Sequence, residues 1–371
     1  MKINADKTEG MIFNKSGKFF RRSFEVNNEQ IFTTNSYKFL GFIVTPSGEI
    51  SSGLKNLKDR ALRAYFKLKK KMGHYFRLHI NVTLHLFDSL IKPILLYNSD
   101  FWGCLKTPLN NPIENIHIRF CKDLLGVQRQ TTNIGVLLEL GRVPIMLYGK
   151  KNCIKNWGRI HIVGSANKIL IWSHLNSLEN NLKWTSSVSD CLNQMGIGGG
   201  NRDVRIHKPA MKRLSDIFHQ EAFAAINRDG SKLRTYAKIK LEPGLENYLS
   251  SIQNVEKRIS LSKIRLSNHD LMIEEGRHLK LEVNQRNCPF CPGNLLEDES
   301  HFLLTCNTFS SLRNDLLCAV KLFIPTFEYW SKEHQMKSLL SEKTIIKLTA
   351  NYLHKALQVR RFILNKHKNI I

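Results

Sequence analysis

The sequence contains no long apolar run and comparatively few acidic residues. No stretch approaches the roughly 20 apolar residues that span a bilayer, and the first residues lack the apolar core of a signal peptide. We therefore expect an intracellular protein, in the nucleus or the cytoplasm. Only 31 Asp and Glu residues oppose 56 Lys and Arg residues. The net charge of +25 predicts attraction to a polyanion, for which nucleic acid is the first candidate and an anionic membrane surface the second.

Other absences narrow the class of protein further. Four of the eight cysteines are scattered singly before residue 288, which suits a reducing compartment better than a disulfide framework. The Gly-rich stretch at residues 196–201 lacks the Lys-Ser/Thr pair of a phosphate-binding loop, so we interpret it as a linker. The chain has no internal repeat. Its 371 residues and 42% hydrophobic content predict two or three globular domains and exclude wholesale disorder.

The residues with the most specific chemistry gather near the C-terminal end, where Cys288-Pro-Phe-Cys291 is followed by His301 and Cys306. Their spacing is Cys-x2-Cys-x9-His-x4-Cys. Two cysteines across a two-residue knuckle can share one ion, and a His and a Cys five positions apart can complete a tetrahedron. Three thiolates and one imidazole suit Zn²⁺. Because protein atoms fill all four positions, we expect a structural zinc and not a catalytic one.

Two other interpretations of this cluster stay open. The cysteines can be incidental buried side chains, and Cys-Pro-Phe-Cys also has the form of a redox motif. A redox motif needs a helix that runs on from its second cysteine, where Pro292 and Gly293 predict a turn instead. It also leaves His301 and Cys306 without a role. The zinc interpretation gives residues 302–304, Phe-Leu-Leu, a place as a small apolar core beneath the ion.

Short β-type stretches precede a mostly helical chain. Residues 30–34 and 37–44 are followed by a Pro-Ser-Gly turn, and the alternation in the second stretch predicts a hairpin. His117, Trp157, Trp172 and Trp184 are expected in the core. Helices are predicted from Leu54 onward, at 84–96 with a kink at Pro93, and at residues 112–124, 134–140, 145–163, 168–178, 210–226, 255–272, 312–322 and 341–364.

The helix predicted from Leu54 is strongly basic. Its apolar residues recur at steps of three and four and form one face, while cations occupy the remainder and only Asp59 opposes them. A basic face is often simply solvated. Here the repulsion among nine cations favours contact with a polyanion, so we predict that this helix binds nucleic acid. The cations are Lys55, Lys58, Arg60, Arg63, Lys67, Lys69, Lys70, Lys71 and Arg77.

Several short motifs follow one another in an order that is itself informative. They are Asn4-x2-Lys7-Thr8, Lys38-Phe-Leu-Gly41, Pro93-Ile-Leu-Leu-Tyr97-x3-Phe-Trp102-Gly103, Glu139-Leu-Gly-Arg142-x-Pro144, Leu266-Ser-Asn-His269-x-Leu-x-Ile-Glu-x-Gly-Arg277 and the Cys/His cluster. Their order resembles the C-terminal part of the reverse transcriptase of a non-long-terminal-repeat (LINE-type) retrotransposon. The resemblance spans most of the chain.

The resemblance implies roles for the matching residues. Lys7 is implied as the palm lysine near the incoming triphosphate. Lys38, Phe39, Leu40 and Gly41 are implied as the primer grip, which holds the 3′ end of the growing strand. The basic helix is implied as the thumb against a template–primer duplex. The intact parent would be an RNA-directed DNA polymerase that copies its RNA using nicked target DNA as primer.

One departure from the family concerns the catalytic carboxylates. A polymerase holds two Mg²⁺ ions about 3.5–4 Å apart on paired carboxylates, which this family carries as an Asp-Asp doublet. The sequence contains no such doublet. Tyr97-Asn-Ser-Asp100 offers a single carboxylate, after the hairpin, and we interpret Asp100 as structural. We therefore expect the chain to bind nucleic acid without polymerising, with Mg²⁺ relevant only to an intact parent.

The predicted fold class is mainly α with a small β start. The predicted divisions are the end of a palm with the primer-grip hairpin (1–50), thumb helices (51–126), a helical connector (127–195), the linker (196–201), a helical segment (202–280), the zinc-binding module (281–310) and basic C-terminal helices (311–371). The alternative function is a stand-alone nucleic-acid-binding or interaction protein derived from such an element. A nuclease is disfavoured, because no Pro-Asp followed by spaced Glu or Lys occurs after Asn307. RNA and DNA both stay open as partners, a membrane is not expected, and the oligomeric state is open.

Overall fold

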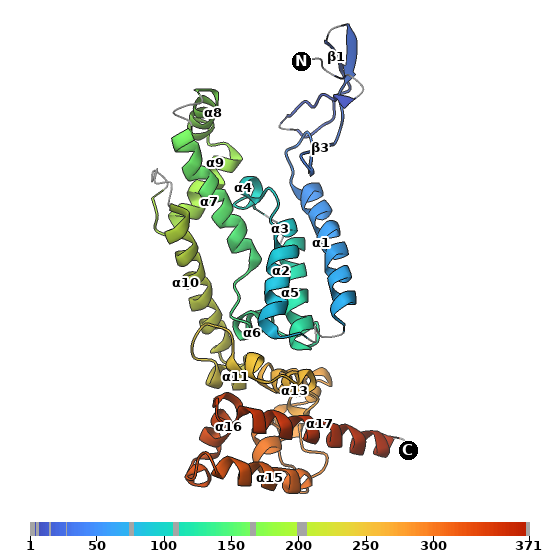
Figure 1. Cartoon of the computed structure of the whole chain (residues 1–371), viewed down its shortest axis with the longest axis vertical. Coiled ribbons are helices and arrows are strands. Elements are labelled where there is room, and N and C mark those ends of the chain that lie inside the picture. Colours follow the sequence, from blue (N-terminus) through green and yellow to red (C-terminus); the bar gives the residue numbers. More distant parts are fainter. Residues whose placement is uncertain are drawn as a thin grey trace. The chain divides into compact units, whose positions relative to one another are not determined.

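A computed structural model of the chain describes residues 4, 7–14, 16–26, 28–73, 78–106, 111–163, 168–198 and 206–368. The fold is mainly helical with two small antiparallel sheets near its start, which confirms the predicted fold class at this coarse level (Figure 1). Within the described residues, no helix combines the length and the apolar character needed to cross a bilayer.

The strands are β1 (Ser23–Val26), β2 (Glu29–Phe32), β3 (Tyr37–Phe39) and β4 (Phe42–Val44). The first helices are α1 (Ser51–Met72), α2 (Ile80–Leu90), α3 (Lys92–Leu95), α4 (Ser99–Trp102), α5 (Pro112–Leu125), α6 (Asn133–Glu139), α7 (Ile145–Val163), α8 (Lys168–Glu179), α9 (Lys183–Gln194) and α10 (His207–Ile226). The later ones are α11 (Arg234–Ile239), α12 (Asn247–Ser251), α13 (Val255–Arg265), α14 (Met272–His278), η3 (Val283–Gln285), η4 (His301–Thr305), η5 (Asn307–Phe309), α15 (Ser310–Lys321), η6 (Phe327–Tyr329), α16 (Lys332–Ser341) and α17 (Ile346–Lys368).

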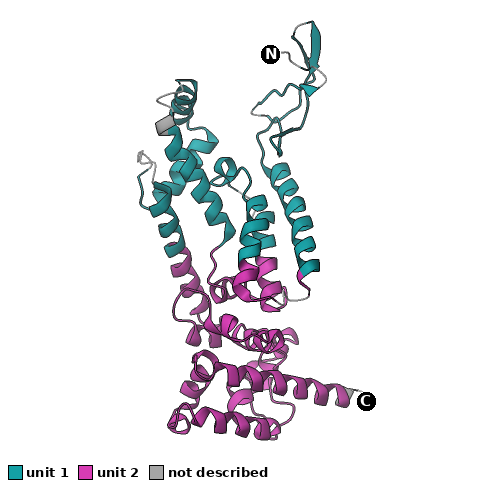
Figure 2. Cartoon of the chain, in the orientation of Figure 1, with its two compact units in different colours: residues 1–71, 85–117, 144–216 teal, residues 72–84, 118–143, 217–371 magenta. Residues whose placement is uncertain are grey.

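The chain forms two compact units (Figure 2). Unit 1 comprises residues 1–71, 85–117 and 144–216, and unit 2 comprises residues 72–84, 118–143 and 217–371. Two parts of the sequence predictions lie outside the described residues, namely the second half of the Gly-rich stretch, 199–201, and the basic residue Arg77.

The predicted hairpin is present in unit 1. β3 pairs with β4 in antiparallel register, with Tyr37 opposite Val44. Leu40 and Gly41 form the turn with positive φ angles of 45° and 87°. Phe42 of β4 packs on α1, because a Cβ added to Gly53 would lie 2.1 Å from its ring. Only a glycine in the first turn of α1 permits this contact, which joins the hairpin to the basic helix.

The helical predictions for residues 51–125 are confirmed. The apolar stripe of α1 is buried from Leu54 to Leu68. Pro93 divides the next helical run into α2 and α3. α5 begins at Pro112, and the side chain of Asn111 accepts a hydrogen bond of 2.8 Å from the Ile113 amide. His117 is a core residue as expected, because it is buried and stacks on Phe87 with ring centroids 5.7 Å apart.

The core of the helical part of unit 1 lies where α4 meets α7. Trp102 and Trp157 are fully buried there. A Cβ on Gly103 would lie 2.0 Å from the Gly149 carbonyl oxygen, so the two backbones approach more closely than any side chain allows. The Asn152 side chain donates a hydrogen bond of 2.8 Å to the Ser99 hydroxyl across the same contact.

Two predictions about individual elements were wrong. Trp172 was expected in the core but is 70% exposed on α8, whereas Trp157 is buried and its ring centroid lies 5.8 Å from that of Trp184. The helix predicted to run to residue 272 ends at Arg265. Ser267 has a φ of 50°, and the Asn268 amide turns back to the Lys263 carbonyl at 2.8 Å. This polar Ser-Asn-His sequence favours a helix end over continuation.

A buried ionic network organises unit 2. Arg265 and Glu139 are both fully buried, and their side chains pair through contacts of 2.7 and 3.2 Å. Arg265 also contacts Glu246 at 2.7 Å. The Tyr248 hydroxyl donates to Glu139 at 2.6 Å. Burial alone would lower the pKa of Arg265, but the two carboxylates raise it, so the guanidinium stays charged.

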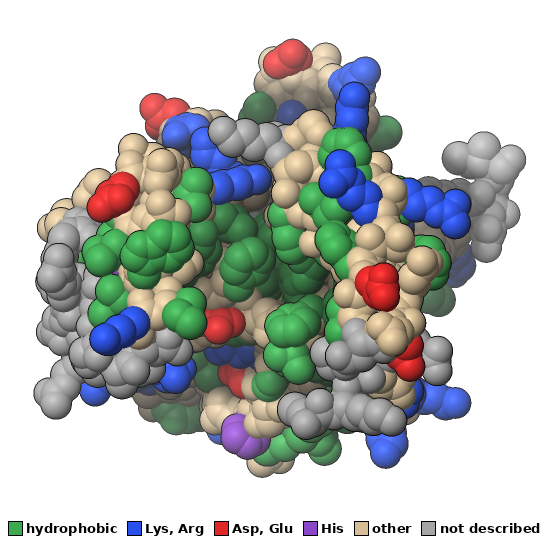
Figure 3. Space-filling model, turned by 90° about the horizontal axis from the view of Figure 1, so that it is seen from above, with side chains coloured by type: hydrophobic (Ala, Val, Ile, Leu, Met, Phe, Trp, Pro, Cys, Tyr) green, Lys and Arg blue, Asp and Glu red, His purple; other side chains and the backbone are tan. Residues whose placement is uncertain are grey.

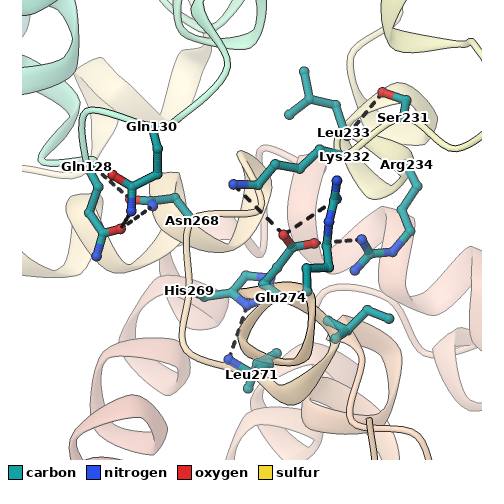
Figure 4. Close-up of polar contacts among 12 residues, drawn as sticks. Gln128, Gln130, Ser231, Lys232, Leu233, Arg234, Asn268, His269, Leu271 and Glu274 are labelled. Atoms are coloured by element: carbon teal, nitrogen blue, oxygen red, sulfur yellow. Dashed lines mark hydrogen bonds and ion pairs between the residues drawn. The ribbon is translucent and has the colours of Figure 1, made fainter. Parts of the chain in front are cut away.

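A second buried ionic network in unit 2 centres on Arg234 (Figure 4). The Arg234 guanidinium contacts Glu274 at 2.8 Å, as drawn in the figure. It also contacts Glu299 at 2.9 Å. His269 pairs with Glu299 at 3.0 Å. Although burial raises the pKa of Glu299, the hydrogen bond from His269 and the charge of Arg234 hold it at about 2. Both networks use acidic residues whose charge is almost fully removed from water.

We expect Glu139→Gln to destabilise unit 2. The variant leaves the buried Arg265 guanidinium with Glu246 as its only carboxylate partner, so the free energy of unfolding should fall by about 3 kcal/mol. Urea unfolding followed by circular dichroism measures this. Glu256→Gln is the matched control, because Glu256 is 74% exposed and pairs with His354 only at 3.7 Å. Equal unfolding midpoints for the two variants would contradict the expectation.

Candidate metal centre

The two-cysteine knuckle is a tight hairpin in unit 2. Asn287 and Leu296 form an antiparallel bridge, and the Cys288 amide donates to the Leu295 carbonyl at 2.7 Å. Gly293 and Asn294 have positive φ angles of 85° and 52°, so the chain reverses after the second cysteine. The predicted turn is therefore present, and it excludes the continuing helix that a redox motif requires.

The other two predicted ligands sit at the ends of a wide helical turn, η4. The Asp298 side chain caps its start by accepting a hydrogen bond of 2.7 Å from the His301 amide. The Cys306 amide donates to the His301 carbonyl at 2.8 Å, which is an i→i+5 bond. Five residues of ordinary α-helix would rotate Cys306 by about 140° from His301. The wider turn instead allows both side chains to face the same ion.

The four predicted ligands come together. The ligand atoms of Cys288, Cys291, His301 and Cys306 all lie within 4.8 Å of one another. The Cys306 sulfur lies 3.8 Å from that of Cys288 and 3.7 Å from that of Cys291. A tetrahedron with metal–sulfur bonds of about 2.3 Å has sulfur–sulfur edges of about 3.8 Å. The cluster can therefore hold a metal ion. In the part of the chain that the structure describes, no other group of three or more His, Cys, Asp and Glu residues is close enough to do so.

One ring nitrogen of His301 has a hydrogen-bond partner and the other does not. Its Nδ1 atom lies 3.1 Å from the Thr305 hydroxyl, which also donates to the His301 carbonyl at 3.4 Å. A hydroxyl that donates to the carbonyl can accept a hydrogen bond from Nδ1, and a proton on Nδ1 leaves Nε2 as the nitrogen that can bind a metal. The Nε2 atom is buried and has no hydrogen-bond partner. An unpartnered buried nitrogen is costly, and a metal ion would supply its missing partner.

Burial sets the protonation of the metal-free site. It raises the pKa of Cys288 to about 12 and raises that of Cys306, while amide hydrogen bonds from Phe290 and Thr308 act in the opposite direction. Burial also lowers the pKa of His301, which favours the neutral imidazole that a metal needs. Metal binding must displace the thiol protons, so metal affinity should fall as the pH falls.

The C-terminal helices hold the cluster in place. Tyr352 of α17 donates to the Phe302 carbonyl at 2.8 Å, and Arg313 of α15 donates to the Cys306 carbonyl at 2.8 Å. Arg360 of α17 forms a buried two-contact pair with Glu297 at 2.9 and 2.7 Å. Phe302 and Leu303 are fully buried, as expected from the sequence, whereas Leu304 is only half-buried. Residues distant in sequence therefore fix both halves of the site.

The predicted primer-grip residues lie on one exposed turn of unit 1. Phe39 and Leu40 are 58% and 70% exposed, and Lys38 is also exposed. The Tyr97 hydroxyl donates to the Leu40 carbonyl, and the Arg60 guanidinium lies 5.7 Å from the Tyr97 ring centroid. The hairpin turn is thus joined to the basic helix through Tyr97. A bond across 57 residues has no local sequence pattern that would predict it.

The remaining predicted nucleic-acid residues are Lys7 and the cations of α1. Lys7 is exposed, and its amide makes a local bond of 3.2 Å to Asn4. On α1, Lys58, Arg60 and Lys69 are half-buried. The exposed cations of this helix are Lys55, Arg63, Lys67, Lys70 and Lys71. On the face drawn in Figure 3, Lys and Arg side chains lie around hydrophobic ones.

We expect Thr305→Val to weaken metal binding by about 10–100-fold, because it removes the hydroxyl that orients His301 while keeping the side-chain shape. Competition of the full chain with a chromophoric chelator for Zn²⁺ measures the affinity. Thr305→Ser keeps a hydroxyl and should restore most of it. Thr308→Val is the matched control, since it removes an exposed hydroxyl nearby. If Thr305→Val and Thr308→Val bind the ion equally well, His301 is positioned by other contacts.

No protein family, curated protein or solved structure that was compared with the chain matches it. The resemblance to a retrotransposon reverse transcriptase therefore stays with the sequence motifs. What the geometry adds is the metal cluster, the buried networks and the exposed cations.

Proposed function

We propose that the chain is a nucleic-acid-binding protein with a structural zinc ion, corresponding to the C-terminal part of a LINE-type reverse transcriptase. The observation that carries this proposal is the geometry of α1. Its apolar stripe is buried on one side, and exposed cations occupy the opposite side. A template–primer duplex is the partner that the resemblance favours, and the charge of the helix is of the sign that it needs.

Four of the five exposed cations of α1 form a continuous face. At about 100° per residue, Arg63, Lys67, Lys70 and Lys71 fall within an arc of about 100°, opposite the stripe that contains Ala61. None of the four pairs with a carboxylate within the described residues. Their mutual repulsion would be relieved by a phosphate backbone lying along the helix. This argument concerns the backbone of the nucleic acid and predicts little sequence preference.

Zinc is the metal that best fits the cluster. Three thiolates and one imidazole in a closed tetrahedral site are the donor set of structural Zn²⁺ sites, and hard ions such as Mg²⁺ prefer oxygen. With four protein ligands the ion has no open position for water or substrate. We propose that it stabilises the fold of residues 281–310 together with α17.

The proposed function does not include polymerisation by this chain. The two-metal chemistry of nucleotide transfer needs paired carboxylates, and the sequence has no Asp-Asp doublet. Lys7 and the hairpin at Lys38–Gly41 would serve binding of the primer end only. In an intact parent enzyme, upstream sequence would supply the Mg²⁺ ligands.

We expect the purified chain to contain one zinc ion and to lose structure when it is chelated. Structural zinc sites contribute about 10–16 kcal/mol of apparent binding energy near neutral pH, so Cys306→Ser should lower both zinc content and thermal stability. Elemental analysis and circular dichroism measure these. Cys318→Ser is the matched control, because Cys318 is an exposed cysteine outside the cluster. A chain that is zinc-free when purified without chelator would contradict the assignment.

We expect replacement of Arg63, Lys67, Lys70 and Lys71 by Ala to weaken binding of a primer–template duplex and to reduce its salt dependence. Each lost phosphate contact should flatten the slope of log K against log salt by about 0.9, or roughly three to four for the set. Fluorescence anisotropy at several salt concentrations measures this. The control replaces four other exposed lysines of unit 1, namely Lys168, Lys183, Lys208 and Lys212.

Both quadruple variants change the net charge equally, so a general charge effect would lower their affinities alike. If the α1 variant binds with the parent's affinity and slope, α1 is a solvated face and not the nucleic-acid surface. If neither the parent nor the variants bind, the proposed function itself is wrong.

A further inference from the structure

Unit 2 contains a cleft that the zinc cluster and α1 do not explain. It has a volume of about 600 Å³, within the usual range of ligand pockets. Its walls come from the turn after α10, from α11, from α14 and from the segment at Val283–Arg286. Five cations line it, and Asp229 is the only carboxylate that does. We call it the arginine cleft, and its cations are Arg228, Arg234, Lys238, Arg277 and Arg286.

Two of these cations contact buried carboxylates, but only Arg234 is held closely. Arg234 contacts Glu274, which points toward it in Figure 4, and Glu299, and the two carboxylates are only 4% and 2% exposed. Arg277 is 39% exposed and reaches Glu274 only at 3.8 Å, in competition with Arg234 and Lys232. Glu274 therefore serves three cations and neutralises none of them completely. Arg277 keeps donors for another acceptor.

Arg286 is fixed in a different way. Its guanidinium donates to the Leu281 carbonyl at 2.8 and 3.1 Å and to the Ile273 carbonyl at 3.0 Å. These bonds orient the side chain but bring no negative charge. Within the described residues no carboxylate lies within 4.0 Å of Arg286 or of the exposed Arg228. The cleft thus contains two guanidinium charges without a protein counter-ion.

The chemistry of the cleft matches a phosphate-bearing strand. Guanidinium groups bind phosphate oxygens through paired hydrogen bonds, and Arg228 and Arg277 on one cleft can contact adjacent phosphates. The remaining lining includes apolar side chains, namely Ile226, Ala237, Ile273 and Val283. Val283 is 53% exposed, so part of this apolar surface faces the entrance. Such surface suits an unpaired base or a sugar better than it suits a free inorganic ion.

We propose that the arginine cleft binds one or two nucleotides of a single-stranded nucleic acid, with Arg228 and Arg277 contacting its phosphates and Arg286 holding the wall in place. The inference rests on the proposed nucleic-acid binding and adds a second contact site, in unit 2, to the duplex surface on α1. Arg234 is a positioning residue, because its donors are already used by Glu274 and Glu299.

The test uses the zinc-loaded full chain and the double variant Arg228→Gln with Arg277→Gln. Arg228 lies outside the Glu299 network, and Arg277 touches it only through Glu274 at 3.8 Å, so the variant should fold and keep its zinc. We expect its affinity for a 12-nucleotide single-stranded RNA to fall about tenfold at 0.1 M salt, and the salt slope to fall by about 1.4, which is two contacts at 0.7 each. Binding of the primer–template duplex should change little.

The matched control is Lys332→Gln with Lys366→Gln, which removes the same charge from exposed positions in unit 2. It should bind the RNA as the parent does. Replacing Arg228 and Arg277 by Lys should keep the salt slope but recover only part of the affinity, because lysine lacks the paired donors.

Three outcomes overturn the inference, and each has its own reading. If the parent binds RNA but the Gln variant matches the Lys332/Lys366 control, the cleft is not a strand site. If inorganic phosphate binds the parent but not the Gln variant, while the two chains bind the RNA equally, the site takes free phosphate and not a strand. If a polyglutamate 12-mer binds as tightly as the RNA and depends equally on Arg228 and Arg277, the occupant is an acidic peptide. A parent that binds no nucleic acid at all refutes the proposed function instead.

Discussion

The buried pair of Arg265 and Glu139 is the interaction on which unit 2 depends. It joins residues 126 positions apart, and both side chains are fully removed from water. Two carboxylates and the hydroxyl of Tyr248 compensate the charges, so the pair is costly to break from either side. Arg265 ends α13, and it also donates to the Leu340 carbonyl at the end of α16. One guanidinium thereby joins α6, the segment before α12 and the end of α16.

The metal cluster is built on the same principle of distant residues joined through buried charge. Arg360 of α17 pairs with Glu297 inside the cysteine hairpin, and the Glu297 carboxylate also accepts a hydrogen bond of 2.7 Å from the Met272 amide at the start of α14. The cluster, α14 and α17 therefore share one acidic side chain. A metal ion would be bound by a site whose walls extend well beyond residues 281–310, and loss of the ion would be felt by the C-terminal helices.

Buried and exposed arginines have different roles in this protein. Arg265 and Arg360 are paired and structural, whereas Arg228 and Arg63 are exposed and have no carboxylate partner within the described residues. Net charge alone does not separate these groups. Arg258, Arg265, Arg313 and Arg360 are buried in the fold, whereas α1 and the arginine cleft present exposed cations. This division explains how a chain with a charge of +25 still forms compact units.

The sequence by itself determined several helices, the hairpin at residues 37–44 and the four residues of the metal cluster. Periodicity predicted α1 with its buried stripe, proline and glycine placed the break at Pro93 and the end of α5, and residue spacing predicted Cys288, Cys291, His301 and Cys306. These features depend on local geometry, which a sequence pattern records directly. Tertiary structure alone decided that Trp172 is exposed, that Arg258 and Arg265 are buried, and that Arg228 and Arg277 line one cleft. Burial and ion pairing depend on which segments, far apart in the sequence, pack together. The spacing of residues along the chain does not predict these long-range contacts.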